Sequence, residues 1–256
     1  MSVNPNKRAL VFIPTYNEKD NVEWLLNAIK ALNLPLDILF VDDNSPDGTG
    51  KILDELAKSN PEMRISHQPG KAGIGNAHKV GIAWAYAQGY EKLITMDADL
   101  THSPHDIPRL LEHSDDFSVV LGSRYLQENS LDGWNPIRKI LTRVGNILTT
   151  HMLGIKQDAT GAFRVYRLDT IPPALFQSVR SNSYSFFFES LHLLHTNTFS
   201  IKEIPIALPP RTYGSSKMQL KDIFGSVKNL FVIFLEGKLR KKHFLPRNHP
   251  NSGKLL

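Results

Sequence analysis

The feature that most constrains the fold is a repeated alternation of short apolar runs with segments of helical periodicity. The apolar runs lie at residues 9–13, 38–41, 63–66, 93–96 and 117–121, and helix-periodic segments follow the first four at 22–32, 50–58, 76–88 and 104–111. A short apolar run bounded by polar residues is typical of a strand buried on both faces, and amphipathic helices cover such a sheet. We therefore predict an α/β fold built from five such repeats around a mostly parallel sheet.

The second half of the chain is less regular. A helix is predicted over residues 138–153 and a strand over 163–166. The chain has 256 residues and no cysteine, so it is long enough for one large domain with an appended segment and has no disulfide, zinc ribbon or catalytic thiol. Any metal must have oxygen or imidazole ligands, which indicates Mg²⁺ or Mn²⁺.

Neither end of the sequence has the pattern of a secretory signal peptide or of a membrane-spanning helix. The apolar stretch at the start is short and is interrupted by Pro14, unlike a secretory signal peptide. The longest apolar run near the other end, at 230–235, is far below the roughly 20 residues that cross a bilayer. We therefore expect a cytoplasmic protein without a membrane-spanning helix.

The last part of the chain is predicted to be a separate amphipathic and basic tail over residues 219–256, after a domain over 1–218. Apolar residues recur at helical spacing at positions 220, 223, 224, 227, 230, 231, 234 and 235, and cations cluster at 238, 240, 241, 242 and 247, within a net charge of +5. This pattern is typical of an interfacial helix on an anionic membrane surface. A helix packed on the core, with a solvated basic end, explains it equally well.

Two carboxylates follow the fourth predicted strand. Asp97 and Asp99 are two residues apart, so on an extended chain they point to the same side and can face one cation. A hard divalent ion that also binds substrate phosphates suits such a pair. The alternative is that Asp99 or Thr101 only caps the helix that begins near Pro104.

Two more polar clusters end the first two predicted strands. PTYNE at 14–18 offers the ring of Tyr16 and the carboxylate of Glu18, and VDDNSPDGT at 41–49 carries Asp42 and Asp43. Because neighbouring residues point to opposite faces, we expect only one of these two aspartates to meet a ligand while the other supports the loop. All three clusters fall at the carboxyl ends of strands, where open α/β sheets bind their ligands.

Common phosphate-binding fingerprints are absent. The chain has no G-x-x-x-x-G-K-[ST] pattern, and Gly70, Gly73 and Gly75 do not have the spacing G-x-G-x-x-G. The sequence therefore does not favour a dinucleotide-dependent oxidoreductase.

Eight motifs in order resemble those of one family. PTYNE, VDDNSPDGT, GKAGIGNA (70–77), DADLTHSP (97–104) and GSRY (122–125) resemble glycosyltransferase family 2. DATGAFRVYR (158–167), EIPI (203–206) and RTYGSSKM (211–218) are similar to its dolichol-phosphate, or polyprenol-phosphate, mannosyltransferase branch. The resemblance extends from about residue 8 to about residue 220.

This resemblance implies a fold and a set of site residues. The fold would be GT-A, a Rossmann-like sheet that binds a nucleotide sugar, with the amphipathic helix at its C-terminal end. Asp97 and Asp99 would hold Mg²⁺ or Mn²⁺, and they would be catalytic together with Arg124 and Lys217. The positions that match nucleotide-sugar contacts are Pro14, Tyr16, Glu18, Val41, Asp43, Asp97, Ala98, Asp99, Arg211 and Lys217.

The implied activity is transfer of mannose from GDP-mannose to dolichol phosphate or another polyprenyl phosphate, with inversion at C1. The enzyme would be peripheral on the cytoplasmic face of a membrane, with a membrane protein as a candidate partner and no nucleic acid. Three alternatives remain open: another donor such as UDP-glucose, a saccharide acceptor, or a nucleotide-sugar-binding protein without turnover. For each basic residue, the alternative is a solvated surface side chain.

Overall fold

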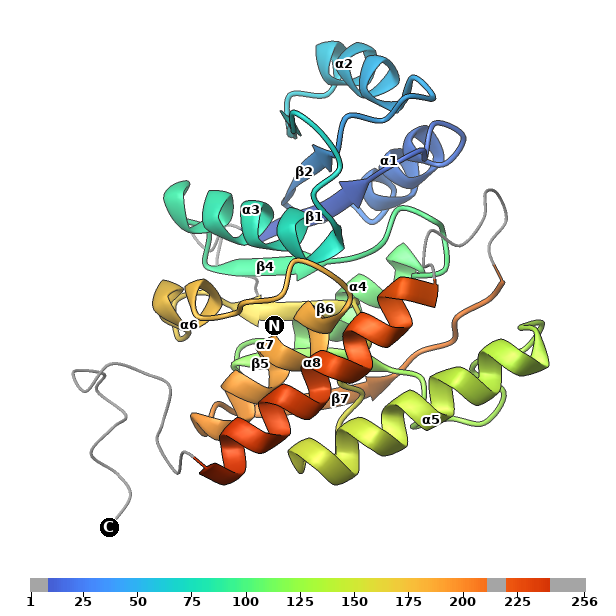
Figure 1. Cartoon of the computed structure of the whole chain (residues 1–256). Coiled ribbons are helices and arrows are strands. Elements are labelled where there is room, and N and C mark those ends of the chain that lie inside the picture. The colour runs from blue at the N-terminus through green and yellow to red at the C-terminus, as the bar shows by residue number, and fades with distance from the viewer. Residues whose placement is uncertain (1–8, 211–219, 240–256) are drawn as a thin grey trace.

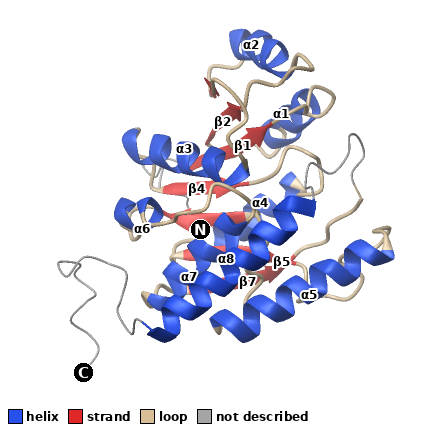
Figure 2. Ribbon diagram, viewed as in Figure 1, coloured by secondary structure: helices blue, strands red, loops and turns tan. Residues whose placement is uncertain are grey.

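A seven-stranded sheet organises the computed structural model, which describes residues 9–210 and 220–239 (Figures 1 and 2). The strands are β1 (Ala9–Thr15), β2 (Leu36–Asp42), β3 (Met63–His67), β4 (Lys92–Thr95), β5 (Val119–Ser123), β6 (Arg164–Arg167) and β7 (Ile201–Pro205). Their order is β3-β2-β1-β4-β6-β5-β7. Strand β6 runs antiparallel to both of its neighbours, and every other pair is parallel.

The helices connect these strands and cover the sheet. They are α1 (Val22–Lys30), α2 (Thr49–Ser59), α3 (Ile74–Ala87), α4 (Ile107–Glu112), α5 (Pro136–Leu153), α6 (Pro173–Gln177), α7 (Ser185–Thr196) and α8 (Leu220–Leu239), with a 3₁₀ turn η1 (Pro104–Asp106) before α4. Within the described residues, no helix combines the length and the apolar character needed to span a membrane.

The apolar strands β1, β2, β4 and β5 are largely buried on both faces of the sheet, whereas β3 at the edge is partly exposed. In β1, Leu10 and Phe12 join one hydrophobic cluster, and Val11 and Ile13 join the other, because successive side chains of a strand alternate between faces. The first cluster also contains residues of α3, α6 and α7, and the second contains residues of α1, α2 and α4. Burial on both faces explains the continuous apolar runs of the sequence.

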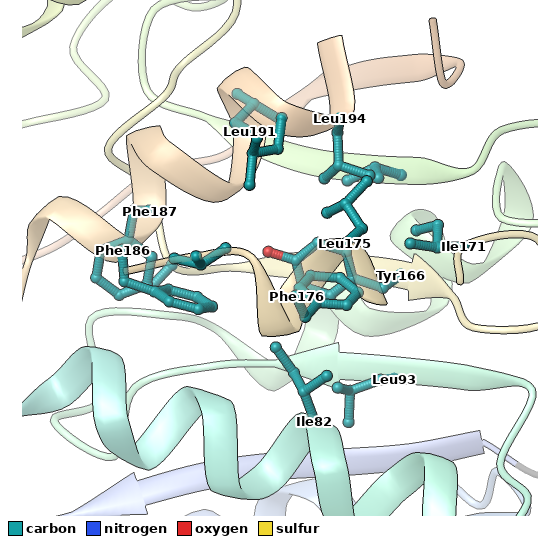
Figure 3. Packing of buried hydrophobic residues seen from close by; sticks show 14 of the residues in the cluster. Ile82, Leu93, Tyr166, Ile171, Leu175, Phe176, Phe186, Phe187, Leu191 and Leu194 are labelled. Carbon is teal, nitrogen blue, oxygen red and sulfur yellow. The ribbon is translucent and has the colours of Figure 1, made fainter. Parts of the chain in front are cut away.

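The core on one face is unusually aromatic (Figure 3). Side chains of α3, α6 and α7 pack there over β4 and β6, as the labelled residues Ile82, Phe176 and Leu191 illustrate. Helix α7 is buried around much of its circumference, with Phe186, Phe187 and the residues that follow inside the core. Because Ser185, Glu189 and Ser190 are buried together with these apolar residues, burial does not follow polarity in α7, and its sequence shows only a weak 3.6-residue apolar periodicity.

The structure confirms the predicted α/β fold and corrects its details. Strand β5 begins at Val119 rather than at 117, and the predicted strand at 163–166 is β6, which lies between β4 and β5 in the sheet. The fifth repeat therefore does not extend the sheet directly beside the fourth. Elements α6, α7 and β7 were not predicted.

Helix α8 has two sides. Leu230 and Ile233 are buried in the core, whereas Phe224 and Phe231 are exposed. The alternative of a helix packed on the core is thus confirmed for part of its surface, and the interfacial role remains a prediction. Arg240 and the later cations of the tail lie outside the described residues.

Candidate active site

The loops after β1 and β2 are tied together at the carboxyl edge of the sheet. The Thr15 hydroxyl donates to Oδ1 of Asp42 at 3.1 Å, and the backbone N–H of Ser45 donates to Oδ2 of Asp42 at 3.1 Å. The backbone N–H of Glu18 donates to the Thr49 hydroxyl at 2.9 Å. Asp42 is therefore the aspartate that supports the loop, as the sequence predicted for one of the pair.

Asp43 differs from its neighbour. It is 5% exposed, and its Oδ1 atom has no hydrogen-bond partner within the described residues. Burial raises the pKa of Asp43, against the lowering effect of the backbone N–H groups of Ala72 and Gly73, and the charge of Asp42 also raises it. A buried acceptor without a partner is an expensive arrangement unless a ligand supplies the donor.

Lys71 is a site residue that the sequence analysis missed. Its Nζ atom lies 4.0 Å from the centroid of the Tyr16 ring, and its charge lowers the pKa of Asp43. A cation at this distance from a ring is favourable electrostatically. The only sequence signal was its place in the glycine-rich stretch between β3 and α3, so Lys71 joins Tyr16 and Asp43 only in three dimensions.

The segment with Asp97 and Asp99 is bent rather than extended. The chain bends at residues 98–100, and Leu100 has a φ of 62°, so the argument from an extended chain was wrong in detail. Oδ1 of the buried Asp99 accepts from the backbone N–H and hydroxyl of Thr101 at 3.1 and 2.6 Å. The alternative, that Asp99 or Thr101 caps the helix near Pro104, is wrong, because Ser103 occupies the N-cap of η1 and no side chain caps that turn.

Arg124 lies in a buried ion pair. Its Nε and Nη2 atoms donate to the two oxygens of Asp158 at 2.8 and 2.6 Å, and Nη2 also donates to the Thr160 hydroxyl at 2.5 Å. The backbone N–H of Asp158 donates to Oε1 of Glu203 at 2.7 Å. Arg124 is therefore not a solvated surface residue. Its partner Asp158 is, after Lys71, the second residue of this region that was not named as a site residue from the sequence.

The pair holds its charges strongly. Burial by itself raises the pKa of Asp158, but the charge and hydrogen bonds of Arg124 lower it below the ordinary value. Burial by itself lowers the pKa of Arg124, but the charge and hydrogen bonds of Asp158 raise it above the ordinary value. The charge of Asp97 also raises it. Arg124 is thus close enough to Asp97 to interact with it electrostatically.

The remaining predicted site residues fall into two groups. Pro14, Val41 and Ala98 are buried at the ends of β1, β2 and β4, and Val41 is fully buried in the hydrophobic core, so its part in a ligand site stays a prediction. Arg211 and Lys217 lie outside the described residues.

The carboxylates fit a divalent cation that is shared with a substrate. Within residues 9–210 and 220–239, no group of three or more His, Cys, Asp or Glu side chains could form a complete protein cage. The Asp97 side chain is 35% exposed. Two carboxylates that leave the remaining positions to water and phosphate oxygens suit Mg²⁺, which rarely has an all-protein cage.

A pocket of about 370 Å³ lies beside Arg124, between the loop after β5 and helix α5. Its lining includes the cations Lys139 and Arg143 and the acids Glu128 and Asp132. Arg124, whose pKa the charge of Asp97 raises, therefore lines a polar pocket that reaches α5.

Comparison with known proteins identifies the family. The sequence profile of Glycosyl transferase family 2 matches residues 10–171, a span that includes all but the first residue of β1, all of β2 to β6, and the candidate site residues from Pro14 to Asp158. The chain belongs to this family. It is therefore a glycosyltransferase by descent, and the resemblance noted in the sequence is confirmed.

Two curated relatives are similar over most of their length. The polyprenol monophosphomannose synthase of Mycolicibacterium smegmatis is 36% identical over 225 residues, which are 87% of this chain and 85% of the relative. The undecaprenyl-phosphate mannosyltransferase of Micrococcus luteus is 35% identical over 212 residues, which are 82% of this chain and 87% of the relative.

Solved structures share the fold at low sequence identity. The glucosyl-3-phosphoglycerate synthase of Mycobacterium tuberculosis, solved with Mn²⁺, UDP and glucosyl-3-phosphoglycerate, is 16% identical, with a TM-score of 0.61 and coverage of 95% of this chain and 82% of that one. A mannosyltransferase of Pyrobaculum calidifontis, solved with GDP-Man and Mn²⁺, is 16% identical, with a TM-score of 0.56 and coverage of 96% and 68%. The fold of this glycosyltransferase is GT-A, as predicted.

Proposed function

We propose that this glycosyltransferase moves mannose from GDP-mannose to dolichol phosphate or another polyprenyl phosphate. The observation that carries the proposal is that two relatives from different genera, each at least 35% identical over more than 80% of this chain, are both named for mannosyl transfer to a polyprenyl phosphate. The motifs around Tyr16, Asp43 and Asp97 lie at the carboxyl edge of the sheet, where a nucleotide sugar binds in such folds.

The nucleoside is proposed to bind between the loops after β1, β2 and β3. Asp43 supplies a buried acceptor for a base or ribose donor, and Lys71 supplies a cation beside Tyr16. Glu18 is buried and accepts from the Asn21 side chain at 2.6 Å, which fixes the loop that carries it. A preorganised pocket of this kind binds without the cost of ordering its side chains.

The diphosphate is proposed to bind at Asp97 and Asp99 through Mg²⁺ or Mn²⁺. When bound, the cation neutralises the charge that builds on the leaving diphosphate. Both solved neighbours described above were crystallised with Mn²⁺, which supports a divalent ion in this fold. Arg124, Arg211 and Lys217 are proposed to hold the anionic substrates near one another.

The proposed chemistry is a single displacement. An oxygen of the lipid phosphate attacks C1 of mannose and forms the new C–O bond, while the bond from C1 to the β-phosphate oxygen breaks and GDP leaves. A phosphate monoester carries about −1.5 to −2 charges at neutral pH, so no strong general base is needed. The protein's contribution is orientation and electrostatic stabilisation, and the mannose configuration inverts.

A membrane-surface contact through α5 and α8 is part of the proposal, because the acceptor has a polyprenyl chain. Nearly all exposed large hydrophobic side chains of the described residues lie on these helices: Ile137, Ile140, Leu141, Val144, Ile147 and Leu148 on α5, and Leu220, Phe224, Val227, Phe231, Val232 and Leu235 on α8. Figure 1 shows the two helices side by side, and they contact each other.

The charge of α5 supports an anionic lipid surface as its partner. The helix contains Arg138, Lys139 and Arg143 but no Asp or Glu. Basic residues beside exposed apolar ones are typical of helices that lie in a membrane interface. The polar pocket that Arg124 lines includes Lys139 and Arg143 of this helix, so a lipid at α5 would be near Arg124. We place this contact on the cytoplasmic face of a membrane.

A panel of donors and acceptors tests the proposal. Purified protein is incubated with GDP-mannose or UDP-glucose and with a short polyprenyl phosphate or an oligosaccharide, and the products are identified by mass spectrometry. We expect mannosyl polyprenyl phosphate alone. A glucosylated lipid would show that the donor is UDP-glucose rather than GDP-mannose, and a glycosylated oligosaccharide would show that the acceptor is a saccharide. The absence of every product would contradict the proposed activity.

A further inference from the structure

His102 is held against the backbone of Asp97. The Asp97 N–H donates to Nδ1 of His102 at 2.9 Å, and the histidine is 3% exposed. Because Nδ1 accepts this bond, the ring proton lies on Nε2. The ring stacks on Phe163, with centroids 5.0 Å apart and an interplanar angle of 23°. One acceptor bond and one aromatic contact therefore set the position, orientation and tautomer of this imidazole.

The stacking partner is itself fixed to the sheet. Phe163 is 1% exposed and immediately precedes β6. The hydroxyl of Thr95, the last residue of β4, donates to the backbone oxygen of Ala162 at 2.6 Å. The imidazole thus rests on a rigid support that is connected to the strand from which the Asp97 loop emerges.

The histidine contact closes the loop that carries both carboxylates. Leu100, between them and His102, has a φ of 62°, a region that bulky residues occupy only when the surrounding structure holds them there. Thr101 holds Asp99 from within the loop, and His102 holds the backbone of Asp97. Asp99 is therefore restrained by Thr101, and Asp97 is restrained by His102.

By accepting from the Asp97 N–H, Nδ1 of His102 also keeps this N–H from bonding to one of the carboxylates. Aspartate side chains readily accept from backbone N–H groups within the same turn. If the Asp97 N–H were released, it could bond to a carboxylate of this loop and turn that group away from a cation. Nδ1 of His102 accepts the N–H without adding a negative charge to those of Asp97 and Asp99.

We propose that His102 is a positioning residue for the divalent-cation site, acting through its Nδ1 bond to the Asp97 backbone. The assignment rests on the proposed function, because it requires a cation at Asp97 and Asp99. Residues that orient metal ligands typically change metal affinity or activity by about 10–100-fold when they are replaced. The acceptor atom, rather than the ring, is the feature that this role requires.

Two substitutions separate the acceptor from the ring. His102→Phe retains an aromatic ring that can stack on Phe163 but removes Nδ1. His102→Asn removes the ring but retains an acceptor oxygen at the same number of bonds from Cα. His105→Phe is the matched control, because His105 is exposed in η1, three residues further along the same loop.

The measurement is the Kd of Mn²⁺ in the presence of GDP, obtained from the electron paramagnetic resonance signal of free Mn²⁺, with a melting curve for each variant. We expect His102→Phe to raise this Kd by about 10-fold or more. His102→Asn and His105→Phe should remain close to the wild type. In transfer assays, the KM for the metal should follow the same order.

Three results would overturn the assignment. An unchanged Kd in folded His102→Phe would overturn it alone. If His102→Phe does not fold, His102→Asn decides: a Kd near that of the wild type supports the role of the acceptor, and a loss of about 10-fold contradicts it. A wild-type protein that binds no Mn²⁺ with GDP would overturn both this assignment and the proposed metal site.

Discussion

At the scale of single residues, the buried pair of Arg124 and Asp158 joins the loop after β5 to the segment before β6. The two side chains are 11% and 0% exposed, and the carboxylate is bound by both Nε and Nη2. Removing one partner of a buried pair leaves the other charge uncompensated. The ion pair therefore fixes the loop after β5, which carries Arg124, to the segment before β6, which carries Asp158.

We expect Asp158→Asn to lower the free energy of unfolding by about 3–5 kcal/mol, because it leaves the buried guanidinium without its counter-charge. Urea denaturation measures the change. Glu55→Gln is the control, because it removes an exposed ion pair with Lys58 and should cost less than about 1 kcal/mol. Equal effects of the two substitutions would show that the Arg124 pair does not stabilise the fold.

The effect of Asp158 should depend on pH in one direction. Its pKa in the folded protein lies below the ordinary value of 3.8, so its stabilising contribution is complete above that value and is lost as the pH falls through the folded pKa. The difference in unfolding free energy between wild type and Asp158→Asn should be constant near neutral pH and shrink below about pH 4. A difference that grows on acidification would contradict this linkage.

At the scale of elements, two helical glycines test the packing of the sheet. A Cβ atom at Gly81 in α3 would lie 2.3 Å from the Phe12 ring, whereas one at Gly145 in α5 would meet nothing within 4 Å. We expect Gly81→Ala to destabilise the protein by about 1–3 kcal/mol through overpacking. Gly145→Ala should stabilise it by up to about 1 kcal/mol through helix propensity. Urea denaturation of both variants gives the comparison, and equal stabilities would contradict the packing of α3 on β1.

The exposed face of α5 gives a second prediction at this scale. Ile140→Asp together with Val144→Asp should abolish flotation with vesicles that contain anionic lipid, because both side chains are exposed and carry no core packing. Lys58→Asp on α2 is the control for added negative charge. Truncation of α8 is a poorer test, since it would remove the buried Leu230 and Ile233. Unchanged flotation of the double variant would exclude α5 as the contact.

The elements also show what the sequence could reveal. Strands β1 to β4 and helices α1 to α3 were predictable, because burial on two faces or on one stripe leaves a readable periodicity. Helix α7 was not, because its polar residues Ser185, Glu189 and Ser190 are buried beside the apolar ones, so polarity does not mark its buried side. The insertion of β6 between β4 and β5 depends on pairing between distant segments, which local patterns do not encode.

The site divides in the same way. Asp43, Asp97 and Asp99 could be found because they follow buried strands in polar clusters. Lys71 and Asp158 could not, since their partners Tyr16 and Arg124 lie 55 and 34 residues away in the chain. Their contacts are tertiary, and in the sequence these residues were marked only as members of the motifs GKAGIGNA and DATGAFRVYR.

At the scale of the whole molecule, the protein has three relevant parts: a GT-A sheet with a carboxylate edge, a polar pocket beside Arg124, and exposed apolar faces on α5 and α8. The proposed donor would bind at the carboxylate edge of the sheet, and the lipid acceptor would approach from the apolar faces of α5 and α8. The proposed transfer would use all three, so an assay of transfer to lipid tests their combination.

The most direct test follows label from GDP-mannose into an organic extract in the presence of Mg²⁺ or Mn²⁺ and a polyprenyl phosphate. We expect label in the lipid phase for the wild type, and none with EDTA or with folded Asp99→Ala or Lys217→Ala. Label that persists with EDTA and in Asp99→Ala would contradict the metal-assisted mechanism, and an unlabelled lipid phase with active, folded wild-type protein would contradict the proposed transfer itself.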